Sequence, residues 1–254
     1  MTNKIEKTAV LGAGVMGAQL AGHFANAGIP TLLFDISQDL SEQGIENLKK
    51  LKPAPLYKPK NTSLITPCTY ENHIELIKEA DWVLEAVAEK LDIKHKLFES
   101  ISPYLKTNAV LSSNTSGIPL NDLIKGLPES IHSRFMITHF FNPPRYMRLL
   151  ELVRSEHTDD SCYNSIAEFG ETVLGKGIVH AKDTPNFIAN RIGVYGMMLS
   201  IYQAIKMNLS VESVDKLTGT VVGRQKSATF RTADLVGLDT LAHVAQTSYD
   251  RGEN

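Results

Sequence analysis

The sequence predicts an α/β fold, in which a doubly wound, mostly parallel sheet is followed by part of an all-helical domain. Three observations predict it. Short apolar runs alternate with amphipathic stretches over residues 1–183. A glycine-rich turn follows the first of these runs, and the alternation stops after Asp183. Such alternation is typical of parallel strands joined by helices that cover both faces of the sheet.

The predicted strands are short apolar runs without polar alternation, as expected for strands that are buried on both faces. They are Thr8–Leu11, Pro30–Phe34, Asp81–Val87, Ala109–Ser112, Phe135–His139, Leu149–Val153 and Ile178–Ala181. Between them, residues 15–27 and 91–105 repeat apolar side chains every three or four positions, which predicts helices. Residues 52–61 contain three prolines, which favour an extended surface loop over a regular helix.

The pattern changes near residue 183, where we place a domain boundary between residues 1–183 and 184–254. Thr184 followed by Pro185 predicts a helix start, because the hydroxyl can cap and proline suits the first helical position. Helical spacing continues over 186–207, 211–217 and 232–249. The chain ends at the stretch SYDRGEN, just after an apolar helical pattern. We therefore expect the helical domain to be incomplete and the chain to be a fragment of a longer polypeptide.

Composition narrows the class of protein. Lys and Arg total 26 against 28 for Asp and Glu, so charge gives no argument for nucleic acid or an anionic membrane as partner. Cys68 and Cys162 are far apart in the sequence and form neither a zinc nor a redox motif, and no metal site is expected. No apolar stretch approaches the ~18 residues of a membrane span. We expect a cytoplasmic protein without a membrane span.

A glycine motif after the first predicted strand indicates a dinucleotide. Gly12, Gly14 and Gly17 form G-x-G-x-x-G at the start of a predicted helix. The three glycines permit a tight turn, a close approach of the diphosphate, and close packing of helix on strand, respectively. Asp35 follows the next strand at the spacing of an acid that binds ribose hydroxyls, which favours NAD over NADP. An ordinary strand–helix turn and a flavin site are the alternatives.

Polar groups follow two further strands, at the edge where a doubly wound sheet binds its ligands. They are Ser112–Ser116 and His139–Pro144. Glu151 lies inside the apolar run LLELV, where a carboxylate is costly to bury without a partner. His139 on a neighbouring strand is a candidate partner. Such a pair would supply a general base for an alcohol proton, although an isolated His and a strand Glu are as often structural.

These motifs together resemble the L-3-hydroxyacyl-CoA dehydrogenase family, the NAD-linked oxidoreductases of fatty-acid β-oxidation. The resemblance covers the whole chain, and its wording is closest to long bacterial members fused to an enoyl-CoA hydratase domain. The motifs are VLGAGVMG (10–17), LFD (33–35), EAVAEKLDIK (85–94), SSNTSG (112–117), HFFNPPRYMRLLELV (139–153), KDTPNFIANR (182–191) and VVGRQKSATFRTADLVGLDT (221–240).

The resemblance implies roles for individual residues. His139 would be the general base in oxidation of a 3-hydroxyacyl-CoA, and Glu151 would orient and polarise it. Ser113 and Asn190 would hydrogen-bond the substrate. Cofactor roles would fall to Gly12, Gly14, Gly17, Asp35, Glu89, Lys94 and Asn142.

The resemblance also implies partners: an acyl-CoA substrate, a second copy of the chain, and an enoyl-CoA hydratase that is fused or associated. One departure is the proline-rich loop 52–61, where family members often carry a longer helical arm. Two other functions stay open on the sequence. The chain could act on a free 3-hydroxy acid, or it could be a non-catalytic NAD(H)-binding module.

Overall fold

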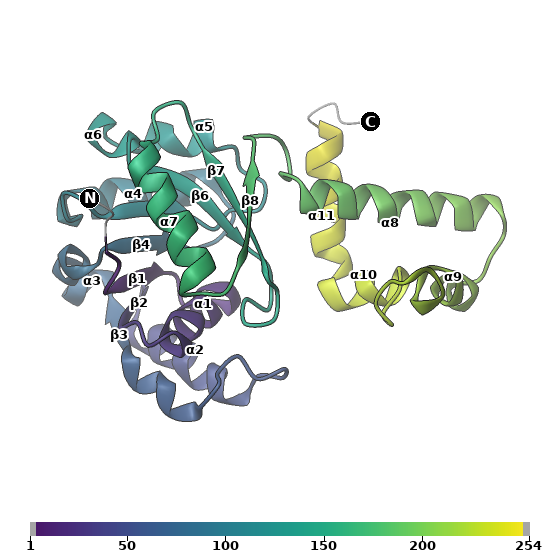
Figure 1. Cartoon of the computed structure of the whole chain (residues 1–254), viewed down its shortest axis with the longest axis horizontal. Helices are drawn as coiled ribbons and strands as arrows, with labels where there is room; N and C mark the ends of the chain where they lie inside the picture. The colour runs from purple at the N-terminus through teal and green to yellow at the C-terminus, as the bar shows by residue number, and fades with distance from the viewer. Residues whose placement is uncertain (1–3, 251–254) are drawn as a thin grey trace. The chain divides into compact units, whose positions relative to one another are not determined.

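The structure is a computed structural model, and it describes residues 4–250. The chain divides into two compact units, Met1–Asp183 and Thr184–Asn254 (Figure 1). The first contains the sheet and the second contains helices.

The first unit is built on an eight-stranded sheet in the order β3-β2-β1-β4-β5-β6-β7-β8. All neighbours are parallel except β6 and β7, which run antiparallel. The strands are β1 Thr8–Leu11, β2 Thr31–Asp35, β3 Ile65–Thr69, β4 Trp82–Glu85, β5 Val110–Ser113, β6 Phe135–Phe140, β7 Leu149–Arg154 and β8 Gly177–Ala181. The predicted α/β class with a mostly parallel sheet is confirmed.

Strand β3 escapes the sequence prediction for a physical reason. Its sequence ITPCT contains Pro67 and two threonines, so it lacks the apolar run of the other strands. Proline cannot donate to a sheet ladder and is therefore tolerated at a sheet edge. β3 occupies such an edge, paired with β2 alone.

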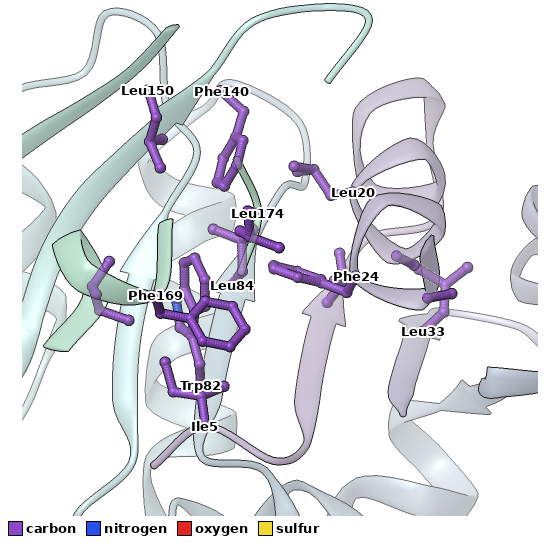
Figure 2. Packing of buried hydrophobic residues seen from close by; sticks show 14 of the residues in the cluster. Ile5, Leu20, Phe24, Leu33, Trp82, Leu84, Phe140, Leu150, Phe169 and Leu174 are labelled. Atoms are coloured by element: carbon purple, nitrogen blue, oxygen red, sulfur yellow. The ribbon is translucent and has the colours of Figure 1, made fainter. Parts of the chain in front are cut away.

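Helices cover both faces of this sheet (Figure 1). They are α1 Val15–Asn26, α2 Gln38–Lys50, α3 Tyr70–His73, α4 Leu91–Ile101, α5 Leu120–Leu123, α6 Glu129–His132 and α7 Asp160–Thr172. On one face Trp82 packs edge-on against Phe24 of α1 and Phe169 of α7, with ring centroids 5.2 and 5.9 Å apart. Figure 2 shows these rings with Leu20 and Leu174 around them. On the other face Phe98 of α4 packs against Phe135 of β6.

The second unit consists of helices α8 Ala189–Lys206, α9 Val211–Thr218, α10 Phe230–Val236 and α11 Leu238–Asp250. The predicted helix start at Thr184–Pro185 is wrong. Asn186 and Phe187 take left-handed backbone angles, with φ of 57° and 50°, so the chain turns there and buries the Phe187 ring before α8 begins. The predicted helix over 232–249 is two helices, because Gly237 at φ 99° breaks it.

Residues 251–254, which belong to the SYDRGEN stretch, lie outside the described residues. Among the residues that the structure does describe, none of the helices combines the length and the apolar character that crossing a membrane requires.

Candidate active site at the carboxyl edge of the sheet

Four neighbouring strands bring their carboxyl ends to one edge of the sheet. β1 leads into the glycine turn, β4 ends at Glu85, β5 ends at Ser113, and His139 is the penultimate residue of β6. The strand order reverses at β1, which lies between β2 and β4. Ligands of open α/β sheets bind outside the carboxyl ends of the strands at such a reversal.

The glycine turn has the geometry of a dinucleotide cradle. Gly12 has φ +102°, and a Cβ there would lie 2.7 Å from the carbonyl oxygen of Ala86. A Cβ on Gly17 would lie 1.8 Å from the Gly12 carbonyl oxygen, so this glycine lets α1 pack on the turn. A Cβ on Gly14, which directly precedes α1, would meet nothing within 4 Å. Open space beside a helix N-terminus fits a diphosphate, so these residues suit NAD.

Asp35 stands at the end of β2, beside this turn. Its Oδ2 accepts a hydrogen bond from the Ala13 backbone N–H at 2.7 Å, and its Oδ1 accepts one from the Ile36 N–H at 2.7 Å. The carboxylate is thus fixed against the glycine turn and remains partly exposed. An oriented carboxylate at this place can accept from ribose hydroxyls, and its charge would repel a 2′-phosphate.

His139 and Glu151 are brought together by the antiparallel pair β6–β7, in which they are direct register partners. His139 Nδ1 donates to Glu151 Oε2 at 2.8 Å. Glu151 is completely buried and His139 is 4% exposed. A carboxylate bonded to one imidazole nitrogen fixes the ring orientation and stabilises the charged ring when it takes up a proton. Such a pair can chemically accept a proton from a hydroxyl.

Asn142 follows His139 in the exposed turn between β6 and β7, at residues 141–148. Its Oδ1 accepts a hydrogen bond from Gln19 Nε2 of α1 at 3.0 Å. This bond ties the turn after His139 to the helix that follows the glycine motif. Gln19 carries no sequence signal of its own, because a polar residue on an amphipathic helix is ordinary.

Glu89 and Lys94 belong to a network that also includes Glu85, in which Glu85 and Lys94 are buried and Glu89 is exposed. Lys94 Nζ lies 2.6 Å from Glu85 Oε1 and 3.2 Å from Glu89 Oε2. Glu89 Oε1 accepts hydrogen bonds from Thr115 Oγ1, from the Ser116 N–H at 2.9 Å and from the Gly117 N–H at 3.2 Å. The network therefore links the end of β4, the first turn of α4 and the segment after β5.

Burial acts to raise the pKa of Glu89, but the Lys94 charge and the hydrogen bonds from Thr115, Ser116 and Lys94 outweigh it. The net result is a Glu89 pKa below its ordinary value. This carboxylate is thus ionised at neutral pH, and it can accept hydrogen bonds from a ligand.

Ser113 points into the same network. Its side chain is fully buried, and its Oγ donates to Glu85 Oε2 at 2.5 Å. The neighbouring Ser112 is also buried, between Trp82 and Thr138. In this arrangement the Ser113 hydroxyl donates to a buried carboxylate inside the protein.

Asn190 is the second residue of α8, in the unit Thr184–Asn254. The joint action of Asn190 with His139 stays a prediction. Among the side chains that the structure describes, no group of three or more His, Cys, Asp or Glu could hold a metal ion.

Sequence reasoning missed Glu85, although a usable signal was present. Glu85 lies between Leu84 and Ala86 in the run DWVLEAV, just as Glu151 lies between two leucines. A carboxylate inside a buried strand needs a partner, and Lys94 supplies it. The argument that singled out Glu151 applies equally to Glu85.

Comparisons with known proteins agree with this geometry. A family model described as "3-hydroxyacyl-CoA dehydrogenase, NAD binding domain" matches residues 7–184. A second, "3-hydroxyacyl-CoA dehydrogenase, C-terminal domain", matches residues 187–254. The crystal structure of M. tuberculosis FadB2 superposes with a TM-score of 0.87 at 29% identity, covering 98% of this chain and 89% of that one.

Two curated relatives are much longer. A "Probable 3-hydroxyacyl-CoA dehydrogenase" of Bacillus subtilis is 47% identical over 274 residues, which include all of this chain and 35% of the relative. A Rickettsia prowazekii protein, named as a fatty acid oxidation complex trifunctional enzyme, is 40% identical over 97% of this chain and 35% of its own length. The chain thus spans about a third of each. By these matches it belongs to the 3-hydroxyacyl-CoA dehydrogenase family and carries that family's NAD-binding domain.

Proposed function

We propose that the protein oxidises an (S)-3-hydroxyacyl-CoA to the 3-oxoacyl-CoA with NAD. The observation that carries the proposal is the buried pair of His139 and Glu151, with Nδ1 and Oε2 2.8 Å apart. The pair lies on the sheet edge that also bears the glycine turn. Membership of the 3-hydroxyacyl-CoA dehydrogenase family supports the same reaction and substrate class.

The protein's task in this reaction is to move one proton and to orient two molecules. NAD, when bound, accepts the hydride from C3 of the substrate. His139 takes the proton of the 3-hydroxyl on its other ring nitrogen, Nε2, while Glu151 stabilises the positive ring through Nδ1. Gly14 would leave room for the diphosphate. Asp35, Glu89 and Asn142 would hold the ribose and nicotinamide parts, and Asn190 would hold the substrate.

Ser113 needs a narrower role than direct substrate binding. Its hydroxyl is buried and donates to Glu85, so it supports the substrate site from inside the protein. Ser116, in the same segment, is partly exposed, and its backbone N–H donates to Glu89. The polar groups of this segment that a ligand can reach therefore belong to residues after Ser113.

The partners that we propose are a second copy of the chain and an enoyl-CoA hydratase, fused or associated, in the cytoplasm. The trifunctional name and greater length of the Rickettsia relative support the hydratase. Exposed apolar side chains along α8 support a protein partner of some kind, since Ile192, Tyr195 and Ile205 are each more than 60% exposed. Light scattering of the purified chain tests self-association directly.

Reduction of acetoacetyl-CoA by NADH, followed at 340 nm on the 254-residue chain, tests the reaction. His139→Gln should lower kcat roughly 10²–10⁴-fold, the usual cost of removing a general base. His157→Gln is the matched control, because this histidine is exposed on the loop after β7. A His139→Gln variant with wild-type kcat would refute the assigned role.

A substrate panel tests the substrate class. Turnover of 3-hydroxybutyryl-CoA and no turnover of free 3-hydroxybutyrate supports the proposal. Turnover of the free acid alone would assign the chain to a dehydrogenase of free hydroxy acids. Tight NADH binding with no turnover of either substrate would indicate that the chain is a non-catalytic cofactor-binding module.

A further inference from the structure

The geometry points to Glu85 as a positioning residue for the cofactor. Its buried carboxylate fixes Lys94, and through Lys94 it orients the carboxylate of Glu89 toward NAD. The inference rests on the proposed function only in placing NAD beside Glu89. The contact with ligand is assigned to Glu89, and Glu85 acts from behind it.

Glu85 is sealed inside the protein. It is 0% exposed, and it is the last residue of β4, next to β1 in the sheet. Its Oε1 accepts from Lys94 Nζ at 2.6 Å and from the Val87 N–H at 2.7 Å, and its Oε2 accepts from Ser113 Oγ at 2.5 Å. A carboxylate with this many donors and no exposed surface cannot reach a ligand, so its effect must pass through the donors.

Lys94 is the donor that transmits the effect. Its side chain is 1% exposed, and its ammonium lies between two carboxylates, closer to Glu85 than to Glu89. Glu89 is the one of these three residues whose side chain keeps substantial exposure, at 30%. The shorter contact of Lys94, 2.6 Å, is therefore with the buried Glu85, and the longer contact, 3.2 Å, is with the partly exposed Glu89.

The position of Lys94 determines how far Glu89 Oε2 can still accept a hydrogen bond from a ligand. Glu89 Oε1 is already occupied by Thr115, Ser116 and Gly117, whereas the contact of Oε2 with Lys94 is 3.2 Å long. Two carboxylates and one ammonium leave a net charge of −1 in the trio. Hydroxyl donors such as those of a ribose are the ligands that an oriented, ionised carboxylate accepts.

Removing the charge of Glu85 should redirect Lys94. In Glu85→Gln the ammonium keeps one ionised partner, Glu89, and is drawn onto its Oε2. The charge of Glu89 is then paired with that of Lys94, and its Oε2 is less able to accept a hydrogen bond from a ligand. We expect NADH to bind roughly tenfold more weakly, which corresponds to the loss of one charge-assisted hydrogen bond.

Calorimetric titration of the 254-residue chain with NADH measures this effect without catalysis. The variants are Glu85→Gln and, as a matched control on the same helix as Lys94, the exposed Glu99→Gln. Glu85→Gln should raise the Kd for NADH roughly tenfold, and Glu99→Gln should leave it unchanged. In steady state, the KM for NADH should rise more than kcat falls. An unchanged Kd in a folded Glu85→Gln variant would overturn the inference.

The variants Lys94→Met and Glu85→Gln/Lys94→Met separate positioning from a purely structural role. Each single variant breaks a buried ion pair and should lower Tm, and the double variant should recover Tm because no unpaired buried charge remains. Without Lys94 no ammonium can be drawn onto Glu89 Oε2, so both variants should bind NADH more tightly than Glu85→Gln does. A Lys94→Met variant that loses as much NADH affinity as Glu85→Gln, in step with its loss of Tm, would show that Glu85 is only structural and would overturn the inference.

Ser113→Ala keeps the inference testable if Glu85→Gln does not fold. It removes one donor to Glu85 Oε2 and leaves every charge in place. We expect roughly threefold weaker NADH binding, less than for Glu85→Gln because Glu85 keeps its charge and its contact with Lys94, and an unchanged Kd would count against Glu85. If the wild-type chain itself failed to bind NADH, the proposed function would fail instead, so the two failures are distinguishable.

Discussion

His139 and Glu151 face each other across β6 and β7, with Nδ1 and Oε2 2.8 Å apart. The eleven residues between them in the sequence form a strand reversal within a sheet whose other neighbouring strands are parallel. Direct partners in an antiparallel pair project their side chains on the same face. The reversal of one strand therefore places a buried carboxylate behind the histidine.

Glu151→Gln should lower kcat on the order of 10²–10⁴-fold while leaving the KM for NADH within about threefold. The amide preserves the shape of the side chain but does not stabilise a protonated imidazole. Single-turnover reduction of acetoacetyl-CoA measures the effect, with circular dichroism as the folding control. A variant whose rate falls less than about threefold would assign Glu151 a structural role.

Alanine substitutions at Gly14 and Gly17 should impair different properties, namely NADH binding at Gly14 and stability at Gly17. Gly17→Ala should lower stability by about 3 kcal/mol or more, at the upper end for overpacking, because its Cβ would lie 1.8 Å from the Gly12 carbonyl oxygen and α1 must shift. Gly14→Ala should fold normally, since its Cβ meets nothing within 4 Å, but should weaken NADH binding at least ~10-fold by intruding on the diphosphate. Urea unfolding and calorimetry report the two quantities separately. Equal losses of stability in both variants would contradict the assignment.

Asp35→Asn should shift the cofactor preference toward NADPH. Asp35 accepts backbone hydrogen bonds from Ala13 and Ile36, and the amide oxygen can keep one of them. Loss of the charge should weaken NADH binding roughly tenfold and remove the repulsion of a 2′-phosphate. The ratio of the Kd values for NADH and NADPH measures the shift. An unchanged ratio would show that the charge of Asp35 does not select the cofactor.

His23 should make stability fall in acid. Burial in α1, with the Lys176 charge adding to it, lowers the pKa of His23 from 6.5 to about 3. The unfolded chain therefore takes up a proton between pH 6.5 and about 3 that the folded chain refuses. The contribution of neutral His23 to stability is complete above pH 6.5 and is lost as the pH falls toward 3.

His23→Leu, an apolar side chain without titration, should flatten the dependence of Tm on pH between 7 and 4. His157→Leu is the matched control on an exposed histidine and should keep the wild-type slope. If His23→Leu retains that slope as well, another group is responsible for the acid sensitivity.

Lys176 should make the stability of the protein depend on pH in the alkaline range. Burial lowers its pKa from 10.5 to about 8, and its Nζ donates to the carbonyl oxygens of Pro144 and Met147. Because the unfolded state binds the extra proton, its contribution to stability should rise with pH between about 8 and 10.5. Lys176→Met should remove this rise in urea titrations at pH 7.5 and 10. A rise of equal size in the variant would exclude Lys176 as its source.

Local pattern was sufficient for the sheet-and-helix alternation and the glycine turn. These depend on side-chain periodicity and on backbone freedom, which neighbouring residues set. The same kind of reasoning failed at Thr184–Pro185, because burial of the Phe187 ring, through left-handed angles at Asn186 and Phe187, delays α8 to Ala189. It also missed β3, whose polar and proline-containing sequence is tolerated at a sheet edge.

Tertiary structure decided which polar groups meet. Only the parallel pairing of β4 with β5 and the packing of α4 bring Ser113 and Lys94 within hydrogen-bond distance of Glu85. The direction of the Ser113 hydroxyl, inward to Glu85, follows from that pairing. The physical reason is that desolvating a charge is costly, so a buried carboxylate takes the nearest donors that the fold supplies, and their distance along the chain is irrelevant.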